Sequence, residues 1–96
     1  MSTDTNFIKK ILKFQIEIDN VRNKLEKKEF HSKIGDILIV LQGNRKVIDV
    51  QILSPMILKD KVLLQENILL AFNDALEKID IDFKKMINKI TGGFGL

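Results

Sequence analysis

An apolar repeat in the N-terminal third of the chain constrains the fold more than any other feature of the sequence. The repeat steps by four and three residues in turn, and its members are Phe7, Ile11, Phe14, Ile18, Val21 and Leu25. This spacing is the heptad seam of an α-helix that packs against a partner helix. The pattern predicts a helix over residues 7–28 that is roughly 33 Å long. Such a helix is longer than a globule of 96 residues needs.

A second apolar strip lies beside the seam, near the N-terminal end of this helix only. Its members are Ile8, Leu12 and Ile16. Apolar faces on helices are ordinarily packing faces. The extra strip therefore indicates a wider contact at this end, and a second subunit is one candidate for it.

Two short apolar segments with β-branched residues follow, and the turn signal Gly43-Asn44 separates them. We interpret residues 37–42 and 46–53 as a β-hairpin. Residues 30–32 are a candidate third, short strand. The predicted sheet is therefore small and antiparallel, with two or three strands.

Capping residues mark the start of the C-terminal helical region. Ser54-Pro55 is typical of an N-cap followed by proline at the first helical position, so we expect a single helical turn over 55–58. Asp60 can then cap a long helix over about residues 61–91, which Gly92-Gly93 would close. The result is one α+β domain over residues 1–96, with a flexible N-terminus at 1–6 and a glycine-rich tail at 92–96.

The second long helix changes character along its length. One face is apolar throughout and carries Phe72, Ala75, Leu76, Ile79, Phe83, Met86, Ile87 and Ile90. In the first half the other sides are apolar as well, with Val62, Leu63, Leu64 and Leu70, which is typical of a buried helix. We expect the sheet and a second subunit to enclose that half. The second half should lie antiparallel to the first helix and form a projecting arm with it, with Phe83 near Phe14 and Ile90 near Phe7.

The lysines of the two long helices are the candidate nucleic-acid contacts. The formal net charge is +3, a mild basic excess that permits DNA binding. In the antiparallel arm, Lys9, Lys10 and Lys13 would lie close to Lys84, Lys85 and Lys89, and such a cluster is typical of phosphate binding. The full set of candidate DNA-binding residues is Lys9, Lys10, Lys13, Lys24, Lys27, Lys78, Lys84, Lys85 and Lys89. The alternative is an ordinary solvated face, diluted by Glu17, Asp74 and Asp82.

The sequence carries no recognisable catalytic, metal or cofactor site. The one histidine, His31, has no cysteine or second histidine with which to share a metal, and the glycines of GGFG follow a helix instead of preceding one. Carboxylates lie mainly beside lysines, as in the i,i+4 pairs Asp74–Lys78 and Asp80–Lys84. We therefore expect no enzyme, no cofactor and no small-molecule substrate.

The N-terminus lacks a basic region followed by an apolar run, and no stretch approaches ~18 consecutive apolar residues. We expect neither a signal peptide nor a transmembrane segment, and no membrane partner. The chain has no cysteine, which fits a reducing compartment.

The segment AFNDALEKI, residues 71–79, resembles the helix signature of the YbaB/EbfC family of bacterial nucleoid-associated proteins. The order of elements, the turn SPMIL and the tail TGGFGL are similar to that family too, so the resemblance covers residues 7–96. It implies a homodimer with tweezer-like helical arms that binds double-stranded DNA with little sequence preference. It also implies a cytoplasmic location at the nucleoid, a part in chromosome organisation, and neither catalysis nor a cofactor.

Asn73 and Asp74 interrupt an otherwise strong helix-forming segment. By the helical wheel, Asn73 sits at the flank of the apolar face, and Asp74 points toward Lys78. We hypothesise that the Asn73 amide binds backbone groups where strand, helix and partner subunit meet. A buried amide there would fix the register of the contact.

The sequence departs from the family in the first strand of the hairpin. Leu38 and Val40 stand where the family's alternation calls for polar residues, and a strand that is apolar on both faces is normally covered on both. Either the dimer encloses the sheet more fully, or a protein partner binds this face. The second case gives an alternative function, a non-enzymatic protein-interaction or assembly module whose surface would be Ile8, Leu12, Ile16, Leu38 and Val40.

Overall fold

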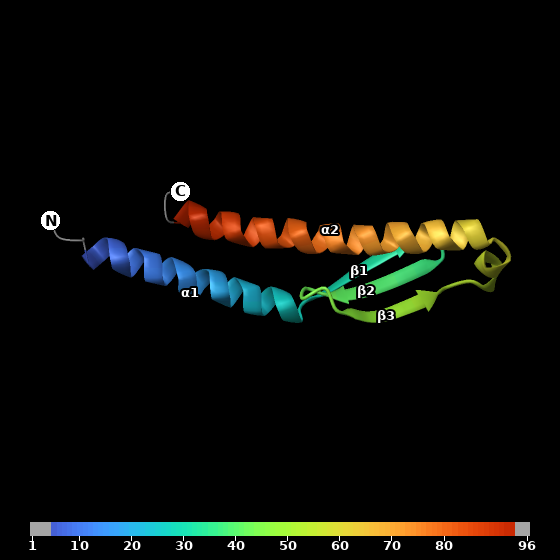
Figure 1. Cartoon of the computed structure of the whole chain (residues 1–96), viewed down its shortest axis with the longest axis horizontal. Coiled ribbons are helices and arrows are strands. Elements are labelled where there is room, and N and C mark those ends of the chain that lie inside the picture. Colours follow the sequence, from blue (N-terminus) through green and yellow to red (C-terminus); the bar gives the residue numbers. More distant parts are fainter. Residues whose placement is uncertain (1–4, 94–96) are drawn as a thin grey trace.

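The computed structural model describes residues 5–93 and gives the chain an elongated shape, with principal extents of 72 × 19 × 16 Å. Its elements in chain order are α1 (Thr5–Lys27), β1 (Glu29–Ile34), β2 (Ile37–Gln42), β3 (Val47–Ile52), the 3-10 helix η1 (Pro55–Lys59) and α2 (Lys61–Gly93). In Figure 1, α2 runs along the sheet and continues beside α1. The predicted α+β class is confirmed. Of the predicted flexible N-terminus and glycine-rich tail, residues 1–4 and 94–96 lie outside the described residues.

The sheet consists of three antiparallel strands in the order β1-β2-β3. The candidate third strand of the sequence analysis is real and longer than predicted, because β1 pairs with β2 along its whole length, from Glu29 opposite Gln42 to Ile34 opposite Ile37. A register shift between β2 and β3 leaves Leu41 opposite Val47 and Val40 opposite Asp49. The hairpin is therefore confirmed, with an irregularity next to its turn.

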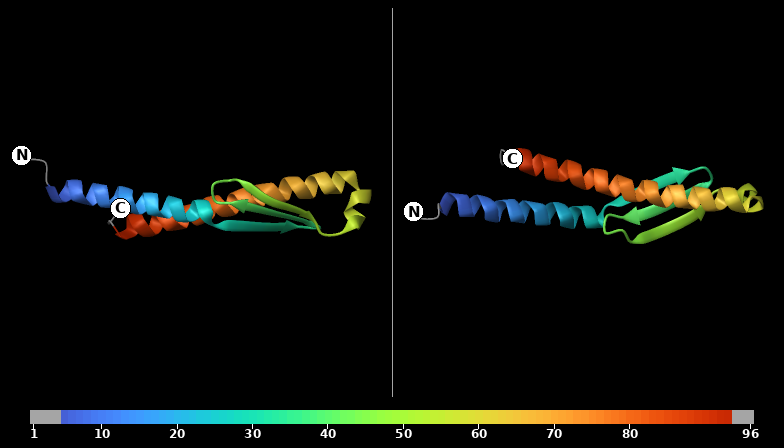
Figure 2. Two further views of the ribbon diagram at one scale, coloured as in Figure 1. Left: turned by 90° about the horizontal axis from the view of Figure 1, so that it is seen from below. Right: turned by 45° about the horizontal axis from the view of Figure 1, so that its top comes forward.

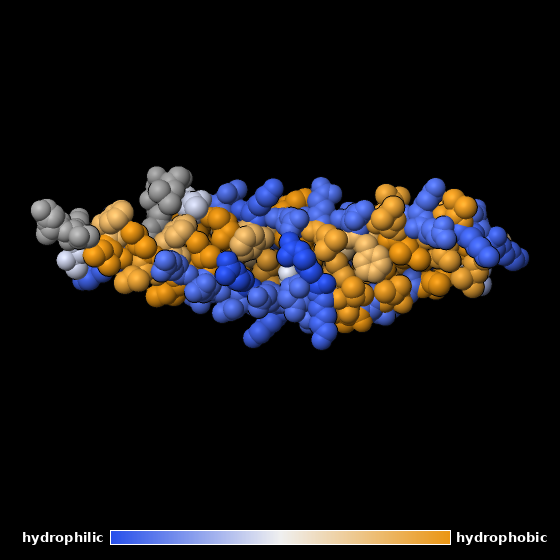
Figure 3. Space-filling model, viewed as in Figure 1, coloured by the Kyte–Doolittle hydropathy of each residue, from blue (hydrophilic) through white to orange (hydrophobic). Residues whose placement is uncertain are grey.

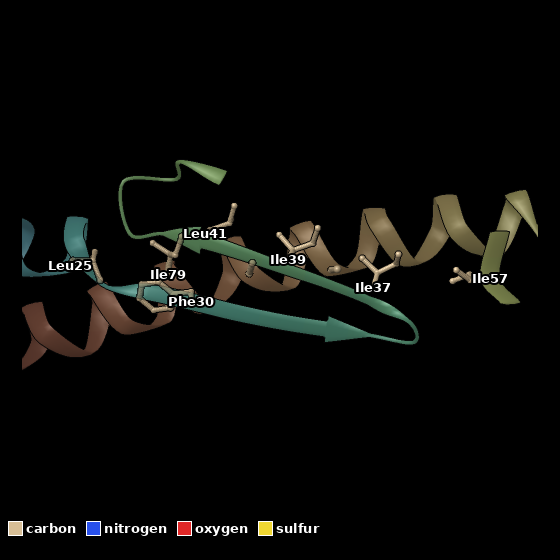
Figure 4. Packing of buried hydrophobic residues seen from close by; sticks show 9 residues of the cluster. Leu25, Phe30, Ile37, Ile39, Leu41, Ile57 and Ile79 are labelled. Atoms are coloured by element: carbon tan, nitrogen blue, oxygen red, sulfur yellow. The ribbon is translucent and has the colours of Figure 1, made fainter. Parts of the chain in front are cut away.

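The core lies between one face of the sheet and the first half of α2, as Figure 4 shows. Alternate residues of β2 point into it, and Ile37, Ile39 and Leu41 are buried. Ala71 and Ala75 of α2 are fully buried in the same cluster. Small side chains at the contact allow a close approach between packed elements. The helix is thus held directly against β1 and β2.

Two glycines shape the turns of the sheet. Gly35, between β1 and β2, has a φ of +55°, in the left-handed region that glycine adopts without strain. Gly43, after β2, lies against the end of α1: a Cβ at this position would be 1.7 Å from the carbonyl oxygen of Leu25. The Gly43 amide also donates a 2.9 Å hydrogen bond to the carbonyl of Lys28. Gly43 therefore fixes where α1 meets the hairpin.

The helix caps predicted from the sequence are present. The Ser54 hydroxyl accepts a 3.3 Å hydrogen bond from the Met56 amide at the start of η1. The Asp60 carboxylate accepts a 3.0 Å bond from the Leu63 amide at the start of α2. Each side chain satisfies an amide that has no partner within its own helix.

The predicted register of the arm is wrong. Phe83 lines a hollow together with Arg22 and Leu25 of α1, so it lies beside the C-terminal end of that helix and not beside Phe14. The 2.8 Å ion pair between Lys28 and Asp82 sets the same register. The physical reason is that α2 crosses the whole sheet before it reaches α1, and only its second half is left to pair. In Figures 1 and 2, α1 consequently extends past the end of α2.

The third strand is poorly covered. All six residues of β3 are exposed, and its apolar members Val47, Ile48, Val50 and Ile52 are each between 43% and 49% exposed. The reason is that α2 packs on β1 and β2, and β3 lies at the open edge of the sheet. Among the described residues, no helix is long and apolar enough to cross a membrane.

Candidate nucleic-acid interface

The segment that carries the family resemblance joins α2 to β1 through Asp74. Its carboxylate accepts a 2.7 Å hydrogen bond from the hydroxyl of Ser32, which is fully buried in β1. The Lys78 ammonium lies 3.1 Å from the same carboxylate and donates a 2.8 Å bond to the carbonyl of His31. The bond from Ser32, together with the bond and charge of Lys78, lowers the pKa of the Asp74 carboxyl. The predicted Asp74–Lys78 contact is thus confirmed, and it is part of a clamp between helix and sheet.

The hypothesis for Asn73 is not supported within the chain. Asn73 is exposed on α2, and the polar contact with the strand is made by its neighbour Asp74. One residue is about 100° of helical rotation, so of two adjacent polar residues only one can face the sheet. Asp74 occupies that direction because Ser32 offers it a buried hydroxyl.

The candidate DNA-binding lysines are all exposed. Eight of the nine form no ion pair or side-chain hydrogen bond within residues 5–93. The ninth, Lys78, is held by Asp74 and His31. Lys24 and Lys27 lie in the last turn of α1, where a positive charge also stabilises the helix dipole. Eight lysines are therefore available to an external anion. Lys78 instead holds α2 to β1 through Asp74 and His31.

The structure does not gather the lysines of both helices at one tip. Because α1 extends past α2, Lys9, Lys10 and Lys13 lie on the free end of α1 (Figure 2). On α2, Lys84, Lys85 and Lys89 follow Asp82, which is paired with Lys28 at the junction of α1 and β1. They therefore lie nearer the sheet than the predicted position at the end of the arm. The basic surface is spread along the arm instead of being concentrated at its end.

Two basic residues outside the predicted set border this surface. Lys28 lines a shallow hollow between β1 and α2, together with His31, Lys78 and Lys85. Arg45 reaches from the β2–β3 turn to α2 and lies 2.6 Å from Asp80. Asp80 therefore pairs with the turn. The i,i+4 spacing had predicted a pair with Lys84 instead, and that prediction is wrong. Arg45 adopts a φ of +68°, and no sequence pattern identifies a contact of that kind between distant segments.

The chemistry of this surface is that of point charges on a helical scaffold. Lysine ammonium groups bind phosphate oxygens without reading bases, and contacts of that kind position a protein on DNA. Among the described residues, no group of three or more His, Cys, Asp or Glu side chains could hold a metal ion. The surface suits a polyanion that offers many equivalent phosphates.

Comparisons with known proteins identify the family of the chain. The model of the YbaB/EbfC DNA-binding family matches residues 1–94. A protein of Mycoplasmopsis pulmonis named as a nucleoid-associated protein is 37% identical over 87 residues, which cover 90% of this chain and 87% of that one. A nucleoid-associated protein of Clostridium acetobutylicum is 30% identical over 94 residues, covering 95% of this chain and 84% of that one.

The fold is similar to a crystal structure of an uncharacterized protein from Helicobacter pylori. The TM-score is 0.76 at 20% sequence identity, over 94% of this chain and 99% of that one. At this identity the likeness concerns the fold alone. The family match over nearly the whole chain, together with the two relatives, shows that this protein belongs to the YbaB/EbfC DNA-binding family.

Proposed function

We propose that this protein is a nucleoid-associated DNA-binding homodimer that contacts duplex phosphates through lysines of its long helices. The observation that carries the proposal is membership of a DNA-binding family, combined with eight exposed lysines that have no partner within residues 5–93. The names of the relatives support a location at the bacterial nucleoid in the cytoplasm. In this proposal the protein has no catalytic role and needs no cofactor.

The homodimer would form over the open side of the sheet half. Exposed apolar residues gather there on β3 and on the first half of α2, the latter being Val62, Leu63, Leu69 and Leu70. Figure 3 shows apolar surface over this half of the molecule. The edge of β3 has no neighbouring strand within the described chain, and unpaired edges are ready to accept another strand. A second copy would cover both the edge and the apolar surface.

The phosphate contacts predict a steep dependence on salt. Each lysine that neutralises a phosphate releases condensed counterions, so the affinity falls log-linearly with salt concentration. The measurement is fluorescence anisotropy on a short duplex over a salt series, with the mass in solution determined in parallel. Binding by a species of twice the chain mass supports the proposal. A protein that fails to bind duplex DNA at low salt contradicts it.

A charge-reversal pair tests the lysines themselves. The Lys85→Glu, Lys89→Glu variant should bind every sequence more weakly, by a similar factor, with a smaller salt slope. The matched control is Lys33→Glu, Lys59→Glu, which makes the same charge change at exposed positions outside the arm. Equal losses in the two variants would mean that net charge alone, and not the arm, determines the affinity.

The alternative of a protein-interaction module loses part of its predicted surface. Val40 is buried within the single chain and Leu38 is half-buried. Val40 is therefore not available to a partner, whereas Leu38 stays partly accessible. Only the strip on α1, Ile8, Leu12 and Ile16, stays exposed.

A further inference from the structure

The side of α1 that faces away from α2 carries a row of residues that the fold does not use. At about 100° per residue, seven residues between positions 9 and 27 lie within about 50° of one line along the helix. This line is about 150° from the seam that packs on α2, and in Figures 1 and 2 none of the described elements covers it. All seven residues are exposed. They form the outer stripe, which consists of Lys9, Lys13, Ile16, Asn20, Asn23, Lys24 and Lys27.

The two ends of the outer stripe are basic and its centre is uncharged. Lys9 and Lys27 are eighteen residues apart, which is five full turns and about 27 Å, so both leave the helix in the same direction. Lys13 and Lys24 are eleven residues apart, or about 17 Å. The stripe residues between these two are Ile16, Asn20 and Asn23. The stripe therefore presents two pairs of positive charges on either side of an uncharged segment.

The acidic side chains of α1 lie off this stripe. Glu17, Asp19 and Glu26 are about 70°, 90° and 110° from its line. Glu17 is half-buried, and the Asp19 carboxylate lies 4.0 Å from the guanidinium of Arg22. The whole helix has five lysines, one arginine and these three acidic residues, which give it a net charge of +3. The outer stripe holds every one of those lysines except Lys10, and none of the acidic residues.

The major groove of duplex DNA matches this pattern in size and chemistry. It is about 12 Å wide, it admits an α-helix, and a phosphate backbone runs along each side of it. Lys13 and Lys24 are separated by slightly more than this width, so each can reach the phosphates of a different strand. The base edges in the groove offer hydrogen-bonding groups and thymine methyl groups, which amides and apolar side chains contact. Asn20 and Ile16 are side chains of these two kinds.

We propose that α1 docks in the major groove of duplex DNA through the outer stripe. Lys9 and Lys13 contact one backbone, Lys24 and Lys27 contact the other, and Asn20 faces the base edges between them. This inference rests on the proposed DNA-binding function, and it adds a groove, a face of the arm and a residue that contacts bases. It departs from the expectation of little sequence preference, because a side chain at base edges distinguishes one sequence from another.

The arrangement of the lysines selects a duplex over a single strand. A single strand has one flexible backbone, and proteins that bind it without sequence preference use aromatic side chains on which the bases stack. The outer stripe has no aromatic residue. Its two lysine pairs instead require two rows of phosphates at a fixed separation, and a duplex supplies them on either side of its groove.

A duplex with a filled major groove tests the proposal with the unmodified protein. In this duplex every cytosine is replaced by glucosylated 5-hydroxymethylcytosine, which places uncharged sugars in the major groove and leaves the phosphates unchanged. Fluorescence anisotropy at one salt concentration compares it with a duplex of the same sequence that contains ordinary cytosine. The affinity for the glucosylated duplex should be lower by about tenfold or more, because the sugars exclude α1 from the base edges.

Two outcomes of this comparison separate the two proposals. Equal affinities for the two duplexes would show that α1 stays outside the major groove, which overturns the present inference and leaves DNA binding intact. A protein that binds neither duplex at low salt would overturn the proposed function, and this inference with it.

A single charge at the centre of the stripe tests the face of the helix. Asn20→Asp should lower the affinity for the ordinary duplex about tenfold, because it replaces an amide at the base edges with a negative charge. The matched control is Gln15→Glu, which makes the same charge change at an exposed position about 130° from the stripe. It should lower the affinity no more than about twofold, since exposed charges at a distance are screened. Equal losses, with the helical content of both variants intact by circular dichroism, would overturn docking by the outer stripe.

The two ends of the stripe should contribute alike. The double variants Lys9→Gln, Lys13→Gln and Lys24→Gln, Lys27→Gln each remove two phosphate contacts, so each should lower the slope of log affinity against log salt by about 1.8. The control Lys33→Gln, Lys59→Gln removes two exposed lysines outside the arm and should leave the slope unchanged. A change at one end alone would mean that α1 does not bridge two backbones, and would overturn the inference.

Discussion

The two halves of α2 belong to different kinds of structure. The part up to about residue 79 packs on a sheet, and Ala71, Ala75 and Ile79 are buried there in one cluster with Ile37 and Ile39. The last turns of α2 form the arm with α1, although Phe83 and Met86 still pack against the core cluster. Among the described residues of that arm, buried positions are limited to Leu25 and Ile90. A sheet covers a helix along a broad face, whereas one helix covers another along a narrow seam. The sheet half therefore supplies most of the stability, and the arm is left to present charge.

An isoleucine-to-alanine change should lower the free energy of unfolding much more in the sheet half of the molecule than in the arm, and this is the largest difference that we expect. Ile39→Ala removes a fully buried side chain from the core and should cost about 2–5 kcal/mol in the free energy of unfolding. Ile11→Ala, at an exposed position of the arm, should cost less than about 1 kcal/mol. Urea denaturation at one fixed protein concentration measures both, because dimerisation would make stability depend on concentration. Similar losses would contradict the division into a core half and a charged arm.

Two glycine substitutions sharpen the comparison at the junction and at the arm. Gly43→Ala places a methyl group against the backbone of Leu25 and should cost about 1–3 kcal/mol, since neither backbone can move freely. In Gly92→Ala the new methyl group meets nothing within 4 Å, and the variant should gain about 0.5–1 kcal/mol from helix propensity. Thermal unfolding followed by circular dichroism distinguishes the two signs. A neutral Gly43→Ala would mean that α1 is not held against the hairpin.

The Asp74 clamp gives a smaller effect that depends on pH. Asp74→Ala leaves the buried Ser32 hydroxyl without its acceptor and should cost about 1–2 kcal/mol at neutral pH. Because the folded-state pKa of Asp74 is lowered, its contribution is fully present above the unfolded pKa of about 3.9 and is lost as the pH falls through the folded-state value. The difference between wild type and variant should therefore shrink in strong acid. Urea midpoints measured between neutral and acidic pH give this difference.

A matched control for the clamp is Asp80→Ala. Asp80 is paired with Arg45, and both side chains are more than half exposed. Exposed pairs contribute little, so the loss should stay below about 1 kcal/mol at every pH. If Asp80→Ala lost as much as Asp74→Ala, the buried hydroxyl of Ser32 would not be the cause of the larger effect.

Features that depend on neighbouring residues were determined by the sequence alone. The heptad repeat of α1, the hairpin, the caps Ser54 and Asp60 and the extent of α2 were all predicted close to their observed positions. Periodicity and capping act within a few residues, so they can be read without knowledge of the fold. The family resemblance, which rests on residues 71–79, is local in the same sense and is confirmed by the family match.

Features that join distant segments were decided only by the tertiary structure. The pairing of Phe83 with the end of α1, the choice of Asp74 over Asn73 as the polar contact, and the pairing of Asp80 with Arg45 all depend on where the sheet places α2. The distribution of lysines along the arm follows from the same register. A shift of two helical turns leaves every local pattern intact yet moves a side chain by about 11 Å, and this is why only the folded chain could settle those contacts.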